Sequence, residues 1–282
     1  MPFALIVICS GGSIRGASLP QICASVLVVS QFTTLKFASS APLARVTLAR
    51  PERLNALSPT VLRELIEVSA ELKASPEVKV VVIGGEGRAF SAGFDLDAAG
   101  AAGPSASTVD LGREMAEAVS AIPALTIARI HGHCVGGAMV LAASCDLRLA
   151  AQSTSFSIPE VDFGIPLAWG GIPRLVRDLG PAITKELVLT CRPFTADEAK
   201  SLGFLNRVAS DESLESEVDE LAADLSAKPG FLIQQTKRLV NAAVEEAYST
   251  GQSFRDAEIT MAALADEESR EVTERYLKAH GR

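Results

Sequence analysis

The hydrophobic pattern of this 282-residue chain predicts an α/β fold in its middle part. Residues 44–49 and 78–83 look like strands, and the second is an almost continuous apolar run, typical of a strand buried on both faces. Residues 125–130 and 147–150 are two further predicted strands. These strands are separated by helical stretches and glycine-rich turns, which is the alternation that α/β folds show.

Three helices are predicted between and after these strands. Ser58 can cap the first, Pro59 suits its first turn, and an apolar stripe follows. Residues 108–122 form the second helix after a loop rich in Gly, Ala and Ser. Residues 137–144 form a short apolar helix that opens at a glycine cluster.

The pattern beyond Gly180 is mostly helical. Thr195 begins a capping box with Glu198, and Gly203 ends that helix. Three amphipathic helices with one charged side then follow, over residues 212–227, 230–246 and 254–279. We therefore divide the chain into an extension (1–31), an α/β core (32–210) and a C-terminal helical region (211–282).

Composition and charge restrict the function. Hydrophobic residues make up 48% of the chain and charged residues 21%, as in a globular protein with a sizeable core. The net charge of −8 argues against nucleic acid as a partner, because phosphate binding needs a concentrated basic face. Five cysteines without CxxC spacing suggest reduced thiols, and neither they nor the histidines show the spacing of a metal site.

Residues 1–31 differ from the rest of the chain. They contain one charge, Arg15, and two apolar runs, both far shorter than the roughly 20 residues that cross a bilayer. A signal peptide would have basic residues before its apolar stretch, and a transit peptide would have several arginines. We interpret this segment as an extension of unknown role. We expect no membrane span and a cytoplasmic protein, with the mitochondrial or peroxisomal matrix as alternatives.

Three loops carry the candidate chemistry, at residues 87–96, 131–138 and 157–166. In the second loop, Gly136 and Gly137 lie where a helix begins, so their N–H groups are unpaired and carry the positive end of the helix dipole. The first loop offers another backbone N–H at Phe94. Two converging donors are what a thioester oxygen needs as negative charge develops on it.

Five motifs together resemble a known family. They are RPERLNAL from Arg50, AFSAGFDL from Ala89, HGHCVGGAMVLAASCDLRLA from His131, IPEVDFGIP from Ile158 and TADEAKSLGFLNRV from Thr195. Their order and spacing resemble the crotonase superfamily, the enoyl-CoA hydratase/isomerase family, from Phe32 almost to the end of the chain. The resemblance implies a ββα-spiral core and a C-terminal helical trimerisation region, with a homotrimer or a dimer of trimers. It also implies an acyl-CoA thioester substrate, as in fatty-acid β-oxidation, and no cofactor beyond the CoA of that substrate.

The resemblance assigns individual residues as well. It implies that the backbone N–H groups of Phe94 and Gly137 form an oxyanion hole, and that Glu160 is the acid/base residue. It places the following residues at the substrate and CoA: Arg53, Ala56, Ala92, Asp95, Leu96, Asp97 and Gly136. Among these, Arg53 is the candidate partner of a CoA phosphate.

The chain departs from the hydratases of this family at Val140. Those hydratases use two glutamates twenty residues apart, and here the second is Glu160 whereas Val140 takes the place of the first. One base can still move a proton from the α-carbon of a Δ3-enoyl-CoA to its γ-carbon, which resembles the Δ3,Δ2-enoyl-CoA isomerases. We expect burial in apolar surroundings to raise the pKa of Glu160 and to suit it to this proton transfer.

Several alternatives stay open at this point. Asp162 is a candidate second acid, because positions two apart in a strand point the same way; otherwise it is a solvated or capping residue. Hydratase (lyase) activity and a non-catalytic acyl-CoA carrier are two other functions. Gly132 begins a GxCxG pattern like a nucleophile elbow, in which Cys134 would need His280 as its base. Trp169 is interpreted as a core or interface residue, with a wall of the acyl pocket as the alternative.

Overall fold

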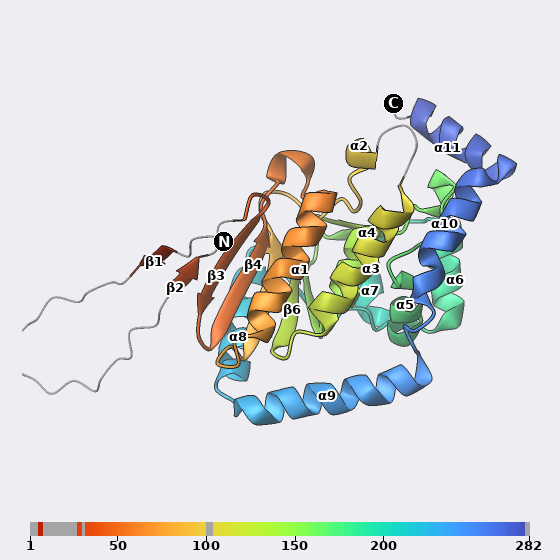
Figure 1. Ribbon diagram of the computed structural model, residues 1–282. Helices are drawn as coiled ribbons and strands as arrows, with labels where there is room; N and C mark the ends of the chain where they lie inside the picture. Colours follow the sequence, from red (N-terminus) through yellow and green to blue (C-terminus); the bar gives the residue numbers. More distant parts are fainter. Residues whose placement is uncertain (1–4, 8–26, 30–31, 100–103, 280–282) are drawn as a thin grey trace, which may run out of the picture.

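The computed structural model describes residues 5–7, 27–29, 32–99 and 104–279. Most of the predicted extension 1–31 therefore lies outside the described residues. An eight-stranded sheet forms the centre of the molecule (Figure 1). Its strands, in spatial order, are β1 (Leu5–Val7), β2 (Leu27–Val29), β3 (Leu35–Ser40), β4 (Leu43–Leu48), β5 (Val80–Gly85), β6 (Leu125–Ile130), β8 (Leu147–Ala151) and β11 (Arg207–Ala209).

The sheet is mixed. β4, β5, β6, β8 and β11 pair in parallel, whereas β1 to β4 pair antiparallel. The four strands predicted from sequence are β4, β5, β6 and β8, and each end lies within two residues of its expected place. A second, three-stranded sheet was not predicted; it consists of β10 (Phe194–Thr195), β9 (Ser155–Ser157) and β7 (His133–Val135).

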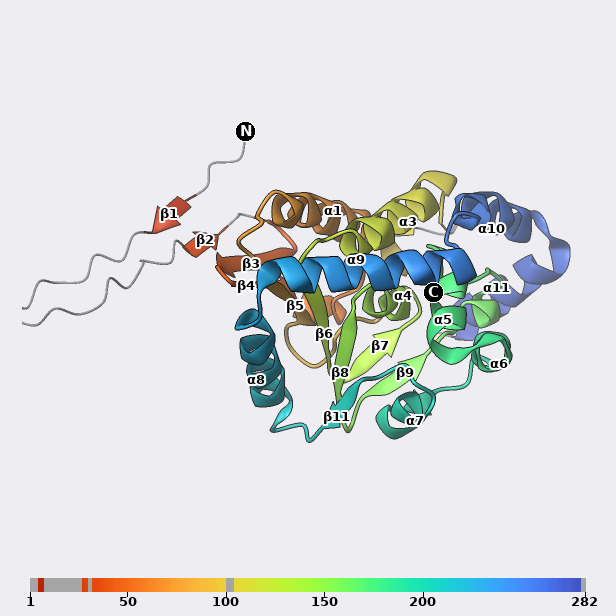
Figure 2. The same cartoon turned by 90° about the horizontal axis from the view of Figure 1, so that it is seen from below.

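Both faces of the large sheet are covered, as the apolar run of β5 predicts. Val81 and Ile83 belong to the main hydrophobic cluster, which also contains residues of α1 (Pro59–Lys73) and α3 (Ala106–Ser120). Val80 and Val82 belong to a second cluster with α8 (Leu214–Ser226). Figure 2 shows α1 and α3 on one side of the sheet and α8 on the other. The fold is α/β, with helices on both faces of the parallel strands.

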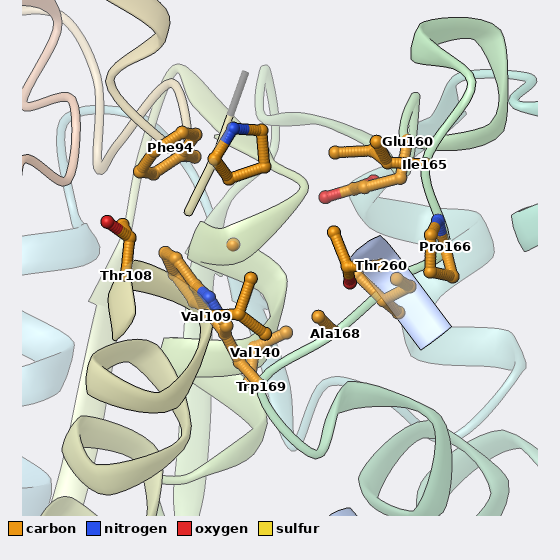
Figure 3. A pocket seen from close by; sticks show the side chains of 13 residues that line it. Phe94, Thr108, Val109, Val140, Glu160, Ile165, Pro166, Ala168, Trp169 and Thr260 are labelled. Atoms are coloured by element: carbon orange, nitrogen blue, oxygen red, sulfur yellow. The ribbon is translucent and has the colours of Figure 1, made fainter. Parts of the chain in front are cut away.

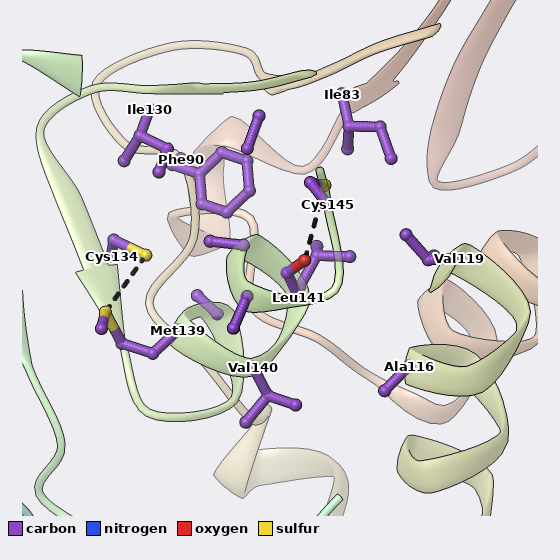
Figure 4. Close-up of a cluster of buried hydrophobic side chains, with 14 of the residues drawn as sticks. Ile83, Phe90, Ala116, Val119, Ile130, Cys134, Met139, Val140, Leu141 and Cys145 are labelled. Carbon is purple, nitrogen blue, oxygen red and sulfur yellow. Dashed lines mark hydrogen bonds between the residues drawn. The ribbon is translucent and has the colours of Figure 1, made fainter. Parts of the chain in front are cut away.

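Local capping signals in the sequence are confirmed. The Ser58 hydroxyl accepts a hydrogen bond from the N–H of Val61 at the start of α1. The Thr195 hydroxyl accepts one from Glu198 at the start of α7 (Ala196–Ser201). The short helix α4 (Gly137–Ala143) is buried along its whole length in the main hydrophobic cluster (Figure 4).

The C-terminal region is helical, but its first helix belongs to the sheet layers. α8 covers one face of the sheet, so the first helix of the predicted C-terminal region packs directly on the core. The long helix α9 (Gly230–Ala247) then runs across one end of the sheet (Figure 2). The buried ammonium group of Lys237 fixes α9 there, through Asp146 at 2.7 Å and the carbonyl of Ala124 at 3.0 Å.

The third predicted C-terminal helix is divided in two. α10 (Asp256–Ala265) ends at Asp266, whose backbone is extended, and α11 (Glu267–Ala279) follows. α10 packs against α3, which brings the C-terminal region close to the strand ends that carry the candidate loops. No helix in the described ranges combines the length and the apolar character that crossing a membrane would require.

Candidate active site

The three candidate loops meet at one pocket (Figure 3). It is a small cavity of about 40 Å³ beside helix α4, and α3 and α10 also contribute to its wall. Its lining among the described residues is mainly apolar: Phe94, Pro104, Thr108, Val109, Gly137, Val140, Glu160, Ile165, Pro166, Leu167, Ala168, Trp169 and Thr260. The structure thus brings together Phe94, Gly137, Val140 and Glu160, which sequence analysis had singled out.

Two backbone N–H groups face this pocket. Leu57 donates to the carbonyl of Gly93 at 2.7 Å and accepts from the N–H of Asp95 at 3.2 Å, so the N–H of Phe94 points to the opposite side of the chain. Gly137 is the first residue of α4. Its backbone nitrogen lies close to the turn before Phe94, since a Cβ atom added at Gly93 would be 3.4 Å from it. Neither Phe94 nor Gly137 donates its N–H to an acceptor in the part of the chain that the structure describes. Both donors are available to a ligand oxygen.

The pairing of two short strands places Glu160 beside the start of α4. β7 and β9 run parallel, with Val135 opposite Ser157, and the N–H of Gly136 donates to the carbonyl of Ser157 at 2.9 Å. Glu160 follows three positions after the end of β9. Gly136 has φ +52°, and a Cβ atom at this position would overlap Oε1 of Glu160. Glycine is therefore required here both by the backbone conformation and by the carboxylate.

Burial raises the pKa of Glu160 to about 7. The residue keeps some exposed surface at the pocket, but its Oε2 atom is buried and has no hydrogen-bond partner among the described residues. No other acidic side chain of the described chain lines the pocket, and the fully buried Val140 forms part of the same wall. A carboxyl group with this pKa can both accept and donate a proton near neutral pH.

The sequence matches the profile of the enoyl-CoA hydratase/isomerase family over residues 38–280. The chain belongs to this family. It is 32% identical to the crotonyl-CoA hydratase of Syntrophomonas wolfei over 206 residues, which are 71% of this chain and 78% of that protein. It is 31% identical to the peroxisomal Δ(3,5)-Δ(2,4)-dienoyl-CoA isomerase of Arabidopsis thaliana over 244 residues, 81% of this chain and 88% of that protein.

The fold agrees with this assignment. The crystal structure of an enoyl-CoA hydratase/isomerase from Xanthobacter autotrophicus Py2 superposes with a TM-score of 0.77 at 30% identity, covering 83% of this chain and 88% of that one. The core therefore has the crotonase fold. The family includes proteins named hydratases and proteins named isomerases, so membership alone does not select the reaction.

Several residues that the family resemblance placed at the substrate have other partners here. The carboxylate of Asp95 is buried and accepts a hydrogen bond from Arg50 at 2.8 Å, so it stabilises the loop and does not line the pocket. Arg53 is exposed and forms an ion pair with Asp97. The other members of this set, Ala56, Ala92, Leu96 and Gly136, also lie outside the pocket lining, although Gly136 contacts Glu160 directly.

The prediction that Asp162 points the same way as Glu160 is wrong. Residues Val161–Phe163 form a 3-10 turn (η2), in which positions two apart do not share a face. Asp162 is exposed and lies outside the pocket lining, whereas Glu160 just before the turn is in it. The structure therefore gives Glu160 no carboxylate partner in Asp162.

The nucleophile-elbow reading of Cys134 does not fit the structure. The thiol is completely buried, with its Sγ atom 3.8 Å from Sδ of Met139 (Figure 4), and burial raises its pKa well above the usual range. A nucleophile needs the thiolate form and access to substrate, and Cys134 has neither. His280, the base that this reading requires, lies outside the described residues.

Two pocket residues had little or no signal in the sequence. Thr260 of α10 is buried and lines the pocket, and its hydroxyl donates to the carbonyl of Asp256 at 2.8 Å. Trp169, interpreted from sequence as a core or interface residue with a pocket wall as the alternative, is nearly buried and lines the pocket. Within the described ranges, no three His, Cys, Asp or Glu side chains gather as a metal ion would require.

Proposed function

We propose that this protein is an enoyl-CoA isomerase that moves a proton from the α-carbon of a Δ3-enoyl-CoA to its γ-carbon. The observation that carries the proposal is that Glu160 is the one acid in the described pocket wall, next to Val140 and with its pKa raised to about 7. A reaction that needs a single proton shuttle suits this site better than one that must hold and activate water.

In this proposal the thioester oxygen accepts hydrogen bonds from the N–H groups of Phe94 and Gly137. These donors are fixed by the Leu57 bridge and by the start of α4, so they require no reorganisation as charge develops. Each such donor is typically worth a factor of about 10²–10³ in rate. The exposed guanidinium group of Arg53, beside Asp97, is the cation that we assign to a phosphate of CoA.

Glu160 carries the proton in two steps. Its carboxylate takes a proton from the α-carbon, the electron pair of that C–H bond forms a double bond to the thioester carbon, and the carbonyl electron pair moves to the thioester oxygen, which gives a dienolate conjugated with the 3,4-double bond. The resulting carboxylic acid returns the proton to the γ-carbon, which restores the carbonyl and leaves the double bond between the α- and β-carbons. Because the pKa of Glu160 is about 7, the carboxylate is available as a base at neutral pH and the acid can give the proton back, while the two N–H donors lower the energy of the dienolate formed between the two transfers.

Hydration of a 2-enoyl-CoA is the second candidate, because crotonyl-CoA hydratase is among the relatives. Hydration adds both a proton and a hydroxyl group, and the water must be oriented and deprotonated while the second site is protonated. Val140 supplies no hydrogen bond for such a water. We therefore favour isomerisation over hydration as the reaction that this protein catalyses.

A paired assay with trans-3-enoyl-CoA and trans-2-enoyl-CoA separates the candidates. We expect the first substrate to be converted to its 2-enoyl isomer, and this turnover to be lost in Glu160→Gln, which keeps the shape but cannot shuttle a proton. Efficient hydration of the second substrate would instead favour hydratase activity. Binding of both thioesters without turnover would favour an acyl-CoA carrier. The same proposal includes the trimeric assembly typical of the family, which light scattering tests. It also includes the family's role in β-oxidation, which the product of this assay tests.

A further inference from the structure

The indole ring of Trp169 is wedged between two helices at glycine positions. At the start of α4, a Cβ atom added at Gly137 would overlap Cζ3 of the ring and would lie 2.9 Å from Cη2. On α3, a Cβ atom added at Gly112 would overlap Cε2 and Nε1 at the opposite edge of the ring. Both helices lack a side chain where the ring passes, so the two glycines provide the space that Trp169 occupies.

The backbone beside Trp169 is fixed by charged groups from two other elements. Asp256, at the start of α10, accepts a hydrogen bond from the N–H of Gly170 at 2.7 Å. The buried guanidinium group of Arg174, in α5 (Gly171–Leu179), donates to the carbonyl of Gly170 at 2.9 Å. Because charge-assisted hydrogen bonds are comparatively strong and the one from Arg174 is buried, the backbone next to Trp169 is held in place.

This fixed ring limits the space beside the proposed thioester site. Trp169 and Phe94 are in edge-to-face contact, with ring centroids 6.0 Å apart and planes at 89°. The N–H groups of Phe94 and Gly137 are the proposed donors to the thioester oxygen, and Trp169 lines the same pocket as these two residues, so its indole takes up space beside the proposed position of the thioester (Figure 3). The cavity of about 40 Å³ has room for only a few non-hydrogen atoms.

We propose that Trp169 determines acyl-chain specificity by limiting the substrate to a short chain, on the order of four carbons. The inference rests on the proposed function, because it assumes that an acyl-CoA thioester occupies this pocket. It adds the substrate class and the residue that selects it. Longer chains would have to displace a ring that is held by Gly112, Gly137 and the anchored Gly170.

Calorimetric titration with two saturated thioesters, butyryl-CoA and octanoyl-CoA, tests the inference without turnover. We expect the wild-type protein to bind butyryl-CoA at least about tenfold more tightly than octanoyl-CoA. Trp169→Gly should shift this ratio at least about tenfold towards octanoyl-CoA. Glycine suits the site because φ at residue 169 is +63°. Free CoA, which has no acyl group, is the control and should bind equally to both proteins.

Trp169 is the one tryptophan in the sequence, so its emission is a second readout that needs no variant. Butyryl-CoA should change the emission of the wild-type protein, whereas free CoA should leave it unchanged. If Trp169→Gly does not fold, Trp169→Leu provides the same comparison with less loss of packing. Equal wild-type affinity for the two thioesters, or a ratio unchanged in the variant, would overturn the inference while the proposed function stands. Failure of the wild-type protein to bind either thioester would overturn the proposed function, and with it this inference.

Discussion

The carboxylate of Glu160 lies directly against the backbone of Gly136, so closely that a Cβ atom at Gly136 would overlap Oε1. This contact results from the parallel pairing of β7 with β9, which aligns the glycine turn with the segment leading to Glu160. The acid and the start of α4 are thereby held together by main-chain geometry. The position of Glu160 should therefore be sensitive to any side chain at residue 136.

We predict that Gly136→Ala lowers kcat by at least about tenfold, because the methyl group displaces the carboxylate from its productive position. The positive φ also adds a backbone cost of about 1–3 kcal/mol. Gly180→Ala is the matched control, since Gly180 also has a positive φ but an added Cβ would meet no atom within 4 Å. Steady-state kinetics and thermal unfolding should show that both variants lose stability and only Gly136→Ala loses activity. Equal activity of the two variants would contradict the account.

The pH dependence of catalysis should follow the ionisation of Glu160. The base form must take the α-proton, so kcat/KM should rise with pH and level off above an apparent pKa near 7. The profile is measured between pH 5 and 9 with a Δ3-enoyl-CoA. A profile that is already flat above pH 5 would mean that the acting base has an ordinary carboxyl pKa.

The raised pKa of Glu160 also affects stability. Here the pH dependence is the opposite of that of catalysis, because stability falls as pH rises. Between the ordinary glutamate pKa of 4.5 and the raised pKa of about 7, the folded state binds the Glu160 proton more tightly than the unfolded state. The free energy of unfolding should therefore fall as pH rises through this window, by on the order of 3 kcal/mol in total. Denaturant unfolding at pH 5 and pH 7.5 measures it, and Glu160→Gln should remove this contribution. A wild-type and variant pair with the same pH dependence would show that burial does not shift this group.

A carboxylate at position 140 should change the balance between isomerisation and hydration. Val140→Glu would add a second acid to the pocket that already contains Glu160, and we predict that hydration of a trans-2-enoyl-CoA increases over the wild-type level. The buried polar group should also destabilise the fold by roughly 1–3 kcal/mol. Val140→Gln is the control, because it is similar in size but cannot transfer a proton. If hydration increased in both variants, the missing second carboxylate would not be the reason for slow hydration by the wild-type protein.

The sequence predicted the parts of this structure that depend on local signals. Ser58 and Thr195 begin helices where expected, because each hydroxyl accepts a backbone N–H within its own turn. The predicted capping box is only half formed, since the carboxylate of Glu198 pairs with Arg192 instead. The loops containing Phe94, Gly137 and Glu160 were singled out by their glycines, by an acid in apolar company and by the family resemblance, and the structure brings the three residues to one pocket.

Features that depend on distant contacts could not be predicted in the same way. β7 and β9 have only three residues each, and their hydrophobic pattern is too short to distinguish them from loop. Thr260 enters the pocket only because α10 packs on α3, more than 130 positions earlier in the chain. Asp162 was placed beside Glu160 by a strand periodicity that the 3-10 turn does not have.

The transfer of a labelled proton tests the central claim, that Glu160 acts as a single shuttle, most directly. A Δ3-enoyl-CoA with two deuterium atoms on its α-carbon is converted in a single turnover, and the product is examined by NMR spectroscopy. Because Oε2 of Glu160 is buried without a partner among the described residues, we predict that deuterium taken from the α-carbon appears on the γ-carbon of the 2-enoyl product. A product with only solvent hydrogen added at the γ-carbon, or formed equally well by Glu160→Gln, would contradict the single-base mechanism.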